Sequence, residues 1–150
     1  MIDVLQKLED ELNDFDSIFE DTFDKDELAI SIENSVLSEC LKNQVTIQLR
    51  WEQIYRHICW IMHCAEDETE RLFSIAFKEL MSDSYKKLQV SEAKTYALSD
   101  HEVVKSKKIL NRAKLLKGNT EGVLDSIKTR GYVLKNVCDV VINDKENYVI

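Results

Sequence analysis

The distribution of helix-breaking residues constrains this chain more than any other feature of its sequence. The 150 residues contain no proline, and all three glycines lie at or beyond Gly118. Inside a helix, glycine costs about 1 kcal/mol and proline about 3 kcal/mol relative to alanine. Hydrophobic residues make up 44% of the chain and charged residues 32%, a balance that suits amphipathic helices. We therefore predict an all-α fold of long helices in a single domain.

Apolar residues at spacings of three and four predict an acidic amphipathic helix over residues 1–23. Its stripe consists of Ile2, Leu5, Leu8, Leu12 and Phe15. Asp24 and Glu27 fit a capping box, so a long helix or helix pair is expected over residues 24–82. Unbroken, it would be about 85 Å long. The acidic cluster at residues 66–70 is the expected place for a break.

Residues 83–99 lose the helical period and predict a short extended connector or a short hairpin. Apolar residues alternate there in part, at Leu88, Val90, Tyr96 and Leu98. Ser99 and Glu102 fit a second capping box and open a final helix over residues 100–143. This helix carries a heptad seam, formed by Leu124, Ile127, Gly131, Leu134, Cys138 and Val141. Gly131 either lets two backbones approach closely on this seam or ends the helix as a left-handed cap. Gly118 and Gly122 allow a second alternative, a kink in the helix between Lys117 and Val123.

The seam and the overlong second helix are hard to bury in one chain. Both features favour self-association, with the six seam residues as the predicted interface between copies. We accordingly expect a stable oligomer larger than a dimer.

Charge is distributed unevenly along the chain. Residues 1–83 hold 7 basic and 20 acidic side chains, whereas residues 84–135 hold 12 basic and 5 acidic ones. The whole chain has a net charge of −8. Such asymmetry indicates two surfaces with different partners, although two solvated helix faces that merely differ would look the same.

The basic segment is the candidate site for nucleic acid. Cations that track a phosphate backbone, together with exposed aromatic rings such as Tyr85 and Tyr96, are what sequence-independent single-strand binding requires. A lysine-rich solvated helix face is the alternative. The candidate contacts are Lys86, Lys87, Lys94, Lys105, Lys107, Lys108, Arg112 and Lys114.

No catalytic or metal chemistry can be picked out of the sequence. Cys59 and His63 lie one helical turn apart, with His57 and Cys64 near, but they fall in an apolar run without the paired short loops of a zinc site. A glycine-rich phosphate loop is missing. We therefore expect neither an enzyme nor a cofactor, and core packing explains these four residues. We also expect a cytosolic protein, because the sequence shows no membrane span or secretory signal.

One segment of about 50 residues resembles the C-terminal half of UvsY-type phage recombination mediators. It has a lead-in with Ser91, Glu92 and Tyr96, and a helix start with Ser99, Asp100, Glu102 and Val103. A late stretch, IKTRGYVLKN from Ile127 to Asn136, follows at the family's spacing. The N-terminal half matches in plan only, as a short acidic start followed by a long helix.

The family's middle region has a basic element ending in Arg-Leu that is tied to DNA binding. The comparable stretch here, Thr69–Leu72, keeps Arg71 and Leu72 among acids. We include Arg71 among the predicted contacts but place the main DNA contact further along, in the connector and the basic helix.

The resemblance implies a non-catalytic mediator that forms a homo-oligomeric ring, a hexamer or heptamer. It also implies three partners: single-stranded DNA, a RecA-like phage recombinase and a single-strand binding protein, in the cytoplasm of an infected bacterial host. The acidic N-terminal segment would dock basic surfaces of these proteins or only keep the ring soluble. A different hypothesis, an acidic helical inhibitor or scaffold that binds a host protein and no DNA, is supported by a pI near 4.9.

Overall fold

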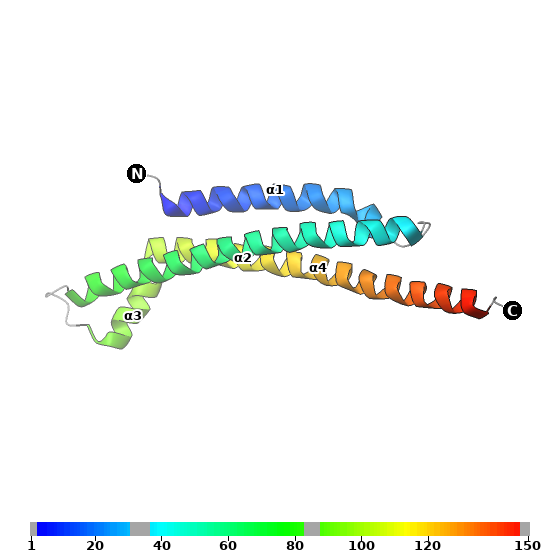
Figure 1. The fold of residues 1–150 in the computed structure, drawn as a ribbon. Helices are drawn as coiled ribbons and strands as arrows, with labels where there is room; N and C mark the ends of the chain where they lie inside the picture. Colours follow the sequence, from blue (N-terminus) through cyan, green and yellow to red (C-terminus); the bar gives the residue numbers. More distant parts are fainter. Residues whose placement is uncertain (1–2, 31–36, 83–87, 148–150) are drawn as a thin grey trace. The chain divides into compact units, whose positions relative to one another are not determined.

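The part of the chain that the computed structural model describes folds into four α-helices (Figure 1). The structure describes residues 3–30, 37–82 and 88–147, and within these ranges it contains no β-strand. This confirms the predicted all-α fold. The helices are α1 (Val4–Ile30), α2 (Leu37–Ser82), α3 (Val90–Leu98) and α4 (His101–Asn147).

Helix α1 confirms the predicted acidic amphipathic helix but is longer than expected. Asp3 caps it, since its carboxylate accepts a hydrogen bond from the backbone N–H of Leu5 at 3.0 Å. Leu5, Leu8, Leu12 and Phe15 are all buried; Ile2 lies outside the described residues. The prediction that Asp24 opens a second helix is wrong. Asp24 lies inside α1 with its side chain exposed, so the Asp–x–x–Glu pattern has no helix end to cap there.

Helix α2 runs without interruption from Leu37 to Ser82. The expected break at residues 66–70 is therefore wrong. Acidic side chains on the outer face do not disturb a helix whose inner face packs, and Ile61, Met62 and Ala65 are buried just before the cluster. Helix α1 ends at Ile30 and α2 begins at Leu37, and residues 31–36 between them lie outside the described residues.

The extended connector predicted for residues 83–99 is also wrong where the structure describes it, because Val90–Leu98 is helical. The alternating residues that suggested an extended chain, Val90 and Leu98 among them, point outward. The buried face of α3 is formed by Ala93 and Ala97, one turn apart. Ala97 packs with Ala76 and Val103 in one apolar cluster.

Helix α4 is continuous through Gly118 and Gly122 to Asn147. Its N-terminal cap is Asp100 and not Ser99. The Asp100 carboxylate accepts hydrogen bonds from the backbone N–H groups of Glu102 and Val103 at 3.0 and 3.4 Å. The Ser99 hydroxyl instead donates to the carbonyl of Tyr96, at the end of α3.

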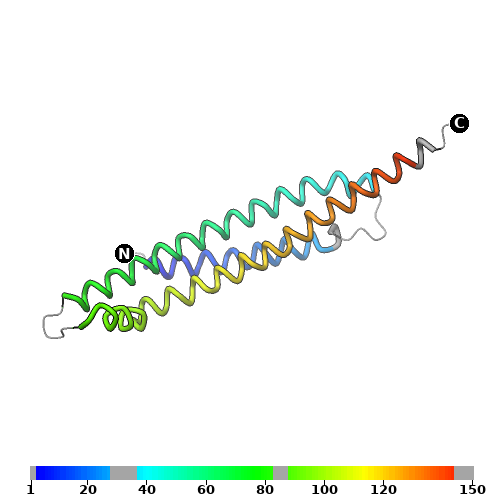
Figure 2. Tube along the Cα trace, turned by 90° about the horizontal axis from the view of Figure 1, so that it is seen from below, coloured from blue at the N-terminus to red at the C-terminus, as the bar shows by residue number. Residues whose placement is uncertain are grey.

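The chain divides into two compact units. Unit 1 comprises residues 1–16 and 57–117, and unit 2 comprises residues 17–56 and 118–150. Helices α1, α2 and α4 each contribute one segment to both units. Within unit 2, the second half of α4 runs beside the first half of α2, and its last turns project past the start of α2 (Figures 1 and 2). None of the described helices has a stretch long and apolar enough to cross a membrane.

Candidate nucleic-acid interface

The predicted basic site falls within unit 1, mostly on the first half of α4. Lys94 lies on α3 and Arg71 on α2, while Lys86 and Lys87 lie outside the described residues. The remaining members are all on α4: Lys105, Lys107, Lys108, Arg112 and Lys114.

Helical geometry separates the α4 cations into two groups. At about 100° per residue, Lys105, Lys108 and Arg112 fall within roughly 60° of one another; we call them the α1-facing row. Lys107 and Lys114, the outer pair, point about 180° away from Lys105. The sequence-based site is therefore not one surface but two opposite sides of one helix.

The α1-facing row lies beside acidic side chains of α1. Lys105 Nζ is 4.0 Å from Asp3 Oδ2, and Arg112 Nη2 is 3.9 Å from Asp16 Oδ2. Together with Lys108 these cations line a shallow pocket of about 180 Å³ that also includes Glu9. These contacts are long and partly exposed, so each pair adds little to stability. Their main effect is to neutralise the row.

The core of unit 1 fixes these carboxylates in place. Asp3 caps α1, and the stripe from Leu5 to Phe15 is buried, so α1 cannot slide without exposing apolar surface. In contrast, no described carboxylate lies within ion-pairing distance of Lys107 or Lys114. Within the basic segment of α4, the outer pair is therefore further from the described carboxylates than Lys105 and Arg112 are.

Arg71 is already engaged by its own helix. Its Nε and Nη2 donate to the two carboxylate oxygens of Glu68 at 2.9 and 2.6 Å. The hydrogen bond and the charge of Glu68 raise the pKa of the Arg71 guanidinium. Because Glu68 is itself buried, Arg71 stabilises a buried carboxylate, and its role in DNA binding stays a prediction.

Helix α3 exposes a cation and an aromatic ring on different sides, because residues two apart on a helix point about 160° away from each other. Lys94 and Tyr96 are both exposed, and Tyr96 exposes 57% of its surface. Since base stacking needs an accessible ring face, Tyr96 satisfies the aromatic part of the predicted site. Tyr85 lies outside the described residues.

The residues of the predicted seam between copies differ in their burial in the structure. Leu124, Ile127 and Leu134 are buried by the chain itself in unit 2, which already accounts for their apolar character. Cys138 is half-buried and Val141 exposed. The role of all six residues in an oligomer stays a prediction.

Gly131 proves to be a point of close approach and not a helix cap. A Cβ atom there would come 2.9 Å from Nε2 of Gln44. The Gln44 amide donates to the carbonyl of Ile127 at 2.8 Å and accepts from Nη1 of Arg130 at 2.6 Å. We call these four residues the Gln44 layer. Sequence reasoning missed both Gln44 and the burial of Arg130, because no local pattern marks a pair 86 residues apart.

The prediction that core packing explains the cysteines and histidines around position 60 is wrong, because His57 and His63 are exposed and Cys59 and Cys64 are only half-buried. The ring of His57 packs edge-on to Phe15 with centroids 5.8 Å apart, and His63 lies 3.3 Å from Glu66. Burial, Glu11 and Asp67 raise the pKa of the Cys64 thiol, which disfavours the thiolate that metals bind. Among the described residues, no three side chains are grouped as metal ligands.

The comparisons with known proteins support the fold. No family model matches the chain, and no curated protein matches it significantly. Among solved structures, the recombination mediator protein UvsY of bacteriophage T4 is similar with a TM-score of 0.67 at 21% sequence identity. The match covers 84% of this chain and 98% of that one. The helical architecture of this chain is therefore similar to that of a phage recombination mediator over nearly the full length of the latter.

Proposed function

We propose that this chain is a non-catalytic recombination mediator. It binds single-stranded DNA and promotes loading of a RecA-like recombinase in place of single-strand binding protein. The observation that carries this proposal is the likeness of the fold to T4 UvsY across almost all of that chain. The basic first half of α4 is the part of the molecule best suited to phosphates.

Within this proposal the outer pair makes the principal contacts. Among the described residues, no carboxylate is within ion-pairing distance of Lys107 or Lys114, whereas Lys105 and Arg112 must give up Asp3 and Asp16 before they bind phosphate. Lys94 extends the cationic surface on α3, and Tyr96 offers a stacking platform. Sequence-tolerant binding follows, because phosphates and ring faces carry little base identity.

Assembly into a homo-oligomeric ring, a hexamer or heptamer, supports the same function. Weak contacts on each subunit add through effective concentration when several subunits hold one strand. The partners in this proposal are single-stranded DNA, the recombinase, the single-strand binding protein and other copies of the chain. The setting is the cytoplasm of an infected bacterial host.

A salt titration with a labelled oligonucleotide tests the DNA contact. The wild type should bind sequence-tolerantly, with a log–log slope of about −0.7 per neutralised phosphate. Lys107→Ala with Lys114→Ala should weaken binding and flatten this slope. The matched control, Lys105→Ala with Arg112→Ala, removes the same charge but should lose less affinity, because α1 already neutralises those cations.

Two results would contradict this picture at different levels. Equal losses of DNA affinity in the two double variants would show that α1 does not weaken the α1-facing row relative to the outer pair, while DNA binding itself would stand. Absence of binding by the wild type at low salt would remove the mediator proposal. The acidic inhibitor or scaffold that binds a protein and no DNA would then take its place, in keeping with the net charge of −8.

A further inference from the structure

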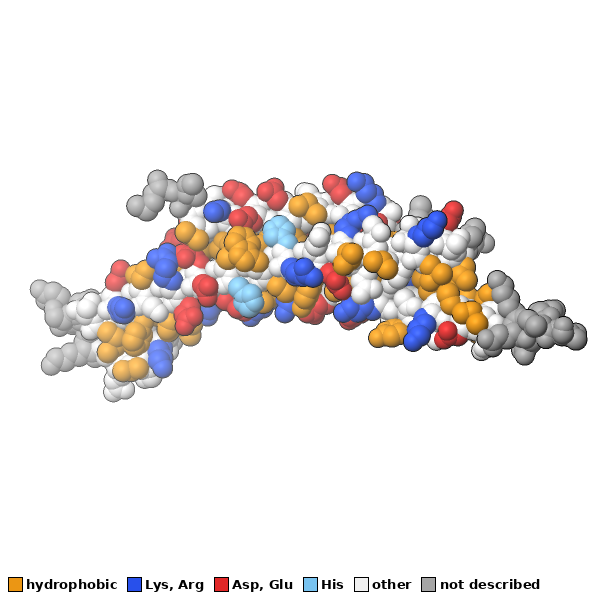
Figure 3. Space-filling model, viewed as in Figure 1, with side chains coloured by type: hydrophobic (Ala, Val, Ile, Leu, Met, Phe, Trp, Pro, Cys, Tyr) orange, Lys and Arg blue, Asp and Glu red, His pale blue; other side chains and the backbone are white. Residues whose placement is uncertain are grey.

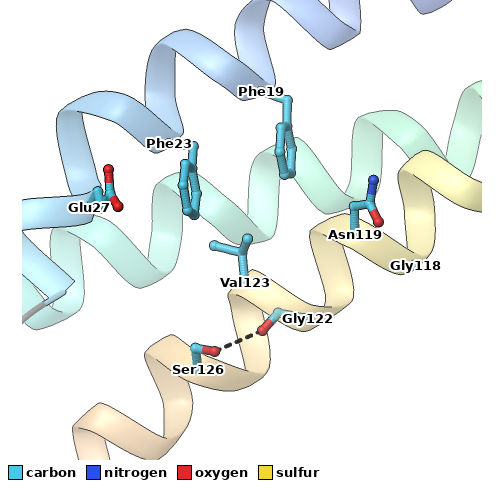
Figure 4. A pocket seen from close by; sticks show the side chains of 8 residues that line it. All are labelled: Phe19, Phe23, Glu27, Gly118, Asn119, Gly122, Val123 and Ser126. Carbon is cyan, nitrogen blue, oxygen red and sulfur yellow. Dashed lines mark hydrogen bonds between the residues drawn. The ribbon is translucent and has the colours of Figure 1, made fainter.

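Unit 2 contains an apolar groove that the mediator proposal does not use. It has a volume of about 600 Å³ and runs between the second half of α1 and the middle of α4 (Figure 4). We call it the aromatic groove. Its lining residues are Phe19, Phe23, Glu27, Gly118, Asn119, Gly122, Val123 and Ser126.

The two aromatic rings of the groove are held in place by contacts with each other and with Trp51. Phe19 and Phe23 stack with ring centroids 6.1 Å apart, and each meets the buried Trp51 edge-on at 5.3 and 6.5 Å. Both rings point from α1 toward Val123 (Figure 4). The groove therefore has a preformed apolar wall, as binding sites for apolar side chains commonly do.

The opposite wall is kept open by two glycines that the fold itself does not need. A Cβ atom at Gly118 or Gly122 would meet nothing within 4 Å. Each glycine inside a helix costs about 1 kcal/mol relative to alanine, and no packing contact within the chain compensates for it. In contrast, Gly131 has a packing reason, because a side chain there would clash with Gln44. Two uncompensated glycines one turn apart leave bare backbone facing the groove.

Charge around the groove is strongly negative. Over residues 19–27 and 118–126, Lys25 is the one basic residue, and Asp26 is occupied by Arg50 and Trp51. The other acids of these two segments are all exposed, and Glu121 among them accepts a hydrogen bond from the Tyr55 hydroxyl. Their charge repels phosphates and attracts cations. These acids are Glu20, Asp21, Asp24, Glu27, Glu121 and Asp125.

We propose that the aromatic groove binds a basic amphipathic helix of a partner protein. Apolar side chains of that helix, spaced by three or four residues, enter between the Phe19–Phe23 wall and the bare backbone of Gly118 and Gly122. Its lysines or arginines lie against the acidic rim. Residues 118–126 span about 12 Å, enough for two or three such side chains.

Charge also decides against the other occupants. A nucleic acid would bring phosphates to the acidic rim. A second copy of this chain would bring the exposed apolar stripe of α4, where Val133, Val137, Val140 and Val141 accompany one cation, Lys135, and one acid, Asp139, and so offer no net positive charge. The inference is independent of DNA binding, which the proposed function places in unit 1.

Fluorescence anisotropy with synthetic helical peptides tests the proposal. The probe is a labelled peptide of about 18 residues, or five turns, with leucines at i, i+3, i+4 and i+7 and lysines on both flanks. A second peptide carries glutamates in place of the lysines. We expect saturable binding of the lysine peptide and at least about tenfold weaker binding of the glutamate peptide.

The decisive variant is Gly122→Leu, which adds a side chain to the groove wall at a position where a Cβ atom meets nothing within 4 Å. It should lose at least about tenfold in affinity for the lysine peptide while its melting temperature stays equal or rises, since leucine favours a helix more than glycine does. Gly118→Leu provides a second, independent test of the same wall. Asn111→Leu, exposed on α4 outside the groove, should bind the peptide like the wild type.

Several outcomes would overturn the proposal. Unchanged peptide affinity in both glycine variants would place the peptide elsewhere, and equal affinity for both peptides would remove the charge argument. A lower sedimentation mass of Gly122→Leu would identify the groove as an interface between copies. Loss of oligonucleotide binding in that variant would identify a nucleic-acid site. If the wild type binds the peptide but no oligonucleotide, this inference stands and the mediator proposal fails.

Discussion

Arg130 is the residue whose environment departs furthest from what its chemistry prefers. It is buried with 4% of its surface exposed. Among the described residues, its Nη1 donates to the amide oxygen of Gln44, and its Nε has no hydrogen-bond partner. In some proteins, buried polar layers specify how two helices align while adding little stability. We therefore expect the Gln44 layer to fix the register of α4 against α2 in unit 2.

Gly131→Ala tests how tightly this layer is built. The new methyl group would displace the Gln44 amide and disturb two buried hydrogen bonds, at about 1–3 kcal/mol for a buried group left unsatisfied. This loss should exceed the gain of about 1 kcal/mol from helix propensity. We expect a lower free energy of unfolding in a urea titration.

Gly122→Ala is the matched control for this substitution. It makes the same chemical change in the same helix, but its Cβ meets nothing within 4 Å, so it should raise stability by up to about 1 kcal/mol. If both substitutions stabilise the protein, Gln44 moves aside freely and the register argument fails.

At the scale of elements, α1 is held to α2 in unit 2 by one buried carboxylate. Asp26 accepts from Arg50 Nη1 at 2.6 Å and from Trp51 Nε1 at 3.0 Å. Trp51 is fully buried and contacts both Phe19 and Phe23. A single side chain thus satisfies the indole N–H and positions the aromatic wall of the groove.

Asp26→Ala should lower the free energy of unfolding by about 1–3 kcal/mol, because the buried indole N–H loses its acceptor. Asp26→Asn retains a carbonyl oxygen and should lose less. Asp24→Ala, an exposed acid on the same helix, should change stability by no more than about 0.5 kcal/mol. Chemical denaturation followed by circular dichroism measures the stability of all three variants. Equal losses of unfolding free energy for the alanine variants at positions 24 and 26 would contradict the role of Asp26 in holding α1 to α2.

The elements themselves were predictable to the extent that their signals are periodic. The apolar stripe of α1 predicted which residues are buried there, because Leu5 to Phe15 repeat over three turns. Caps were not predictable, since Asp24 and Asp100 offer similar local patterns and only one of them lies at a helix end. Helix α3 was missed because its buried face consists of two alanines, which add little to an apolar pattern.

At the scale of the whole molecule, unit 2 leaves apolar surface uncovered. Val133, Val137, Val140 and Val141 line a shallow hollow of about 280 Å³ on the second half of α4. Hydrophobic side chains also gather where this part of α4 meets the start of α2 (Figure 3). On α2, Leu41, Val45 and Leu49 form a second exposed stripe. Exposed patches of this extent are typical of protein interfaces.

We therefore expect an oligomer larger than a dimer in sedimentation experiments at micromolar concentration. Val140→Glu should lower the mass, because a carboxylate would become buried and unpaired between copies at a cost of several kcal/mol. Its melting temperature measured on the dissociated chain should match that of Asn111→Glu, the control on an exposed part of α4. Leu134→Glu would not distinguish loss of assembly from loss of folding, since Leu134 is buried within the chain. A monomeric wild type would contradict the prediction.

The candidate site was predictable in composition but not in arrangement. The sequence places six cations between Lys105 and Lys117, and the resemblance to mediators directs attention to them. Which of them are neutralised depends on Asp3 and Asp16, about a hundred residues earlier in the chain. Contacts over such separations follow from the way α1 packs in unit 1, and no local pattern announces them.

The carboxylates of α1 act on the α1-facing row as tethered counterions. Single-stranded DNA carries condensed cations, and a protein cation that neutralises a phosphate releases them, which makes affinity depend on salt. Lys105 and Arg112 would bring Asp3 and Asp16 close to the phosphates, so the row adds little net positive charge and releases few cations from the DNA. Whatever affinity this row contributes should therefore depend less on ionic strength than the affinity contributed by the outer pair.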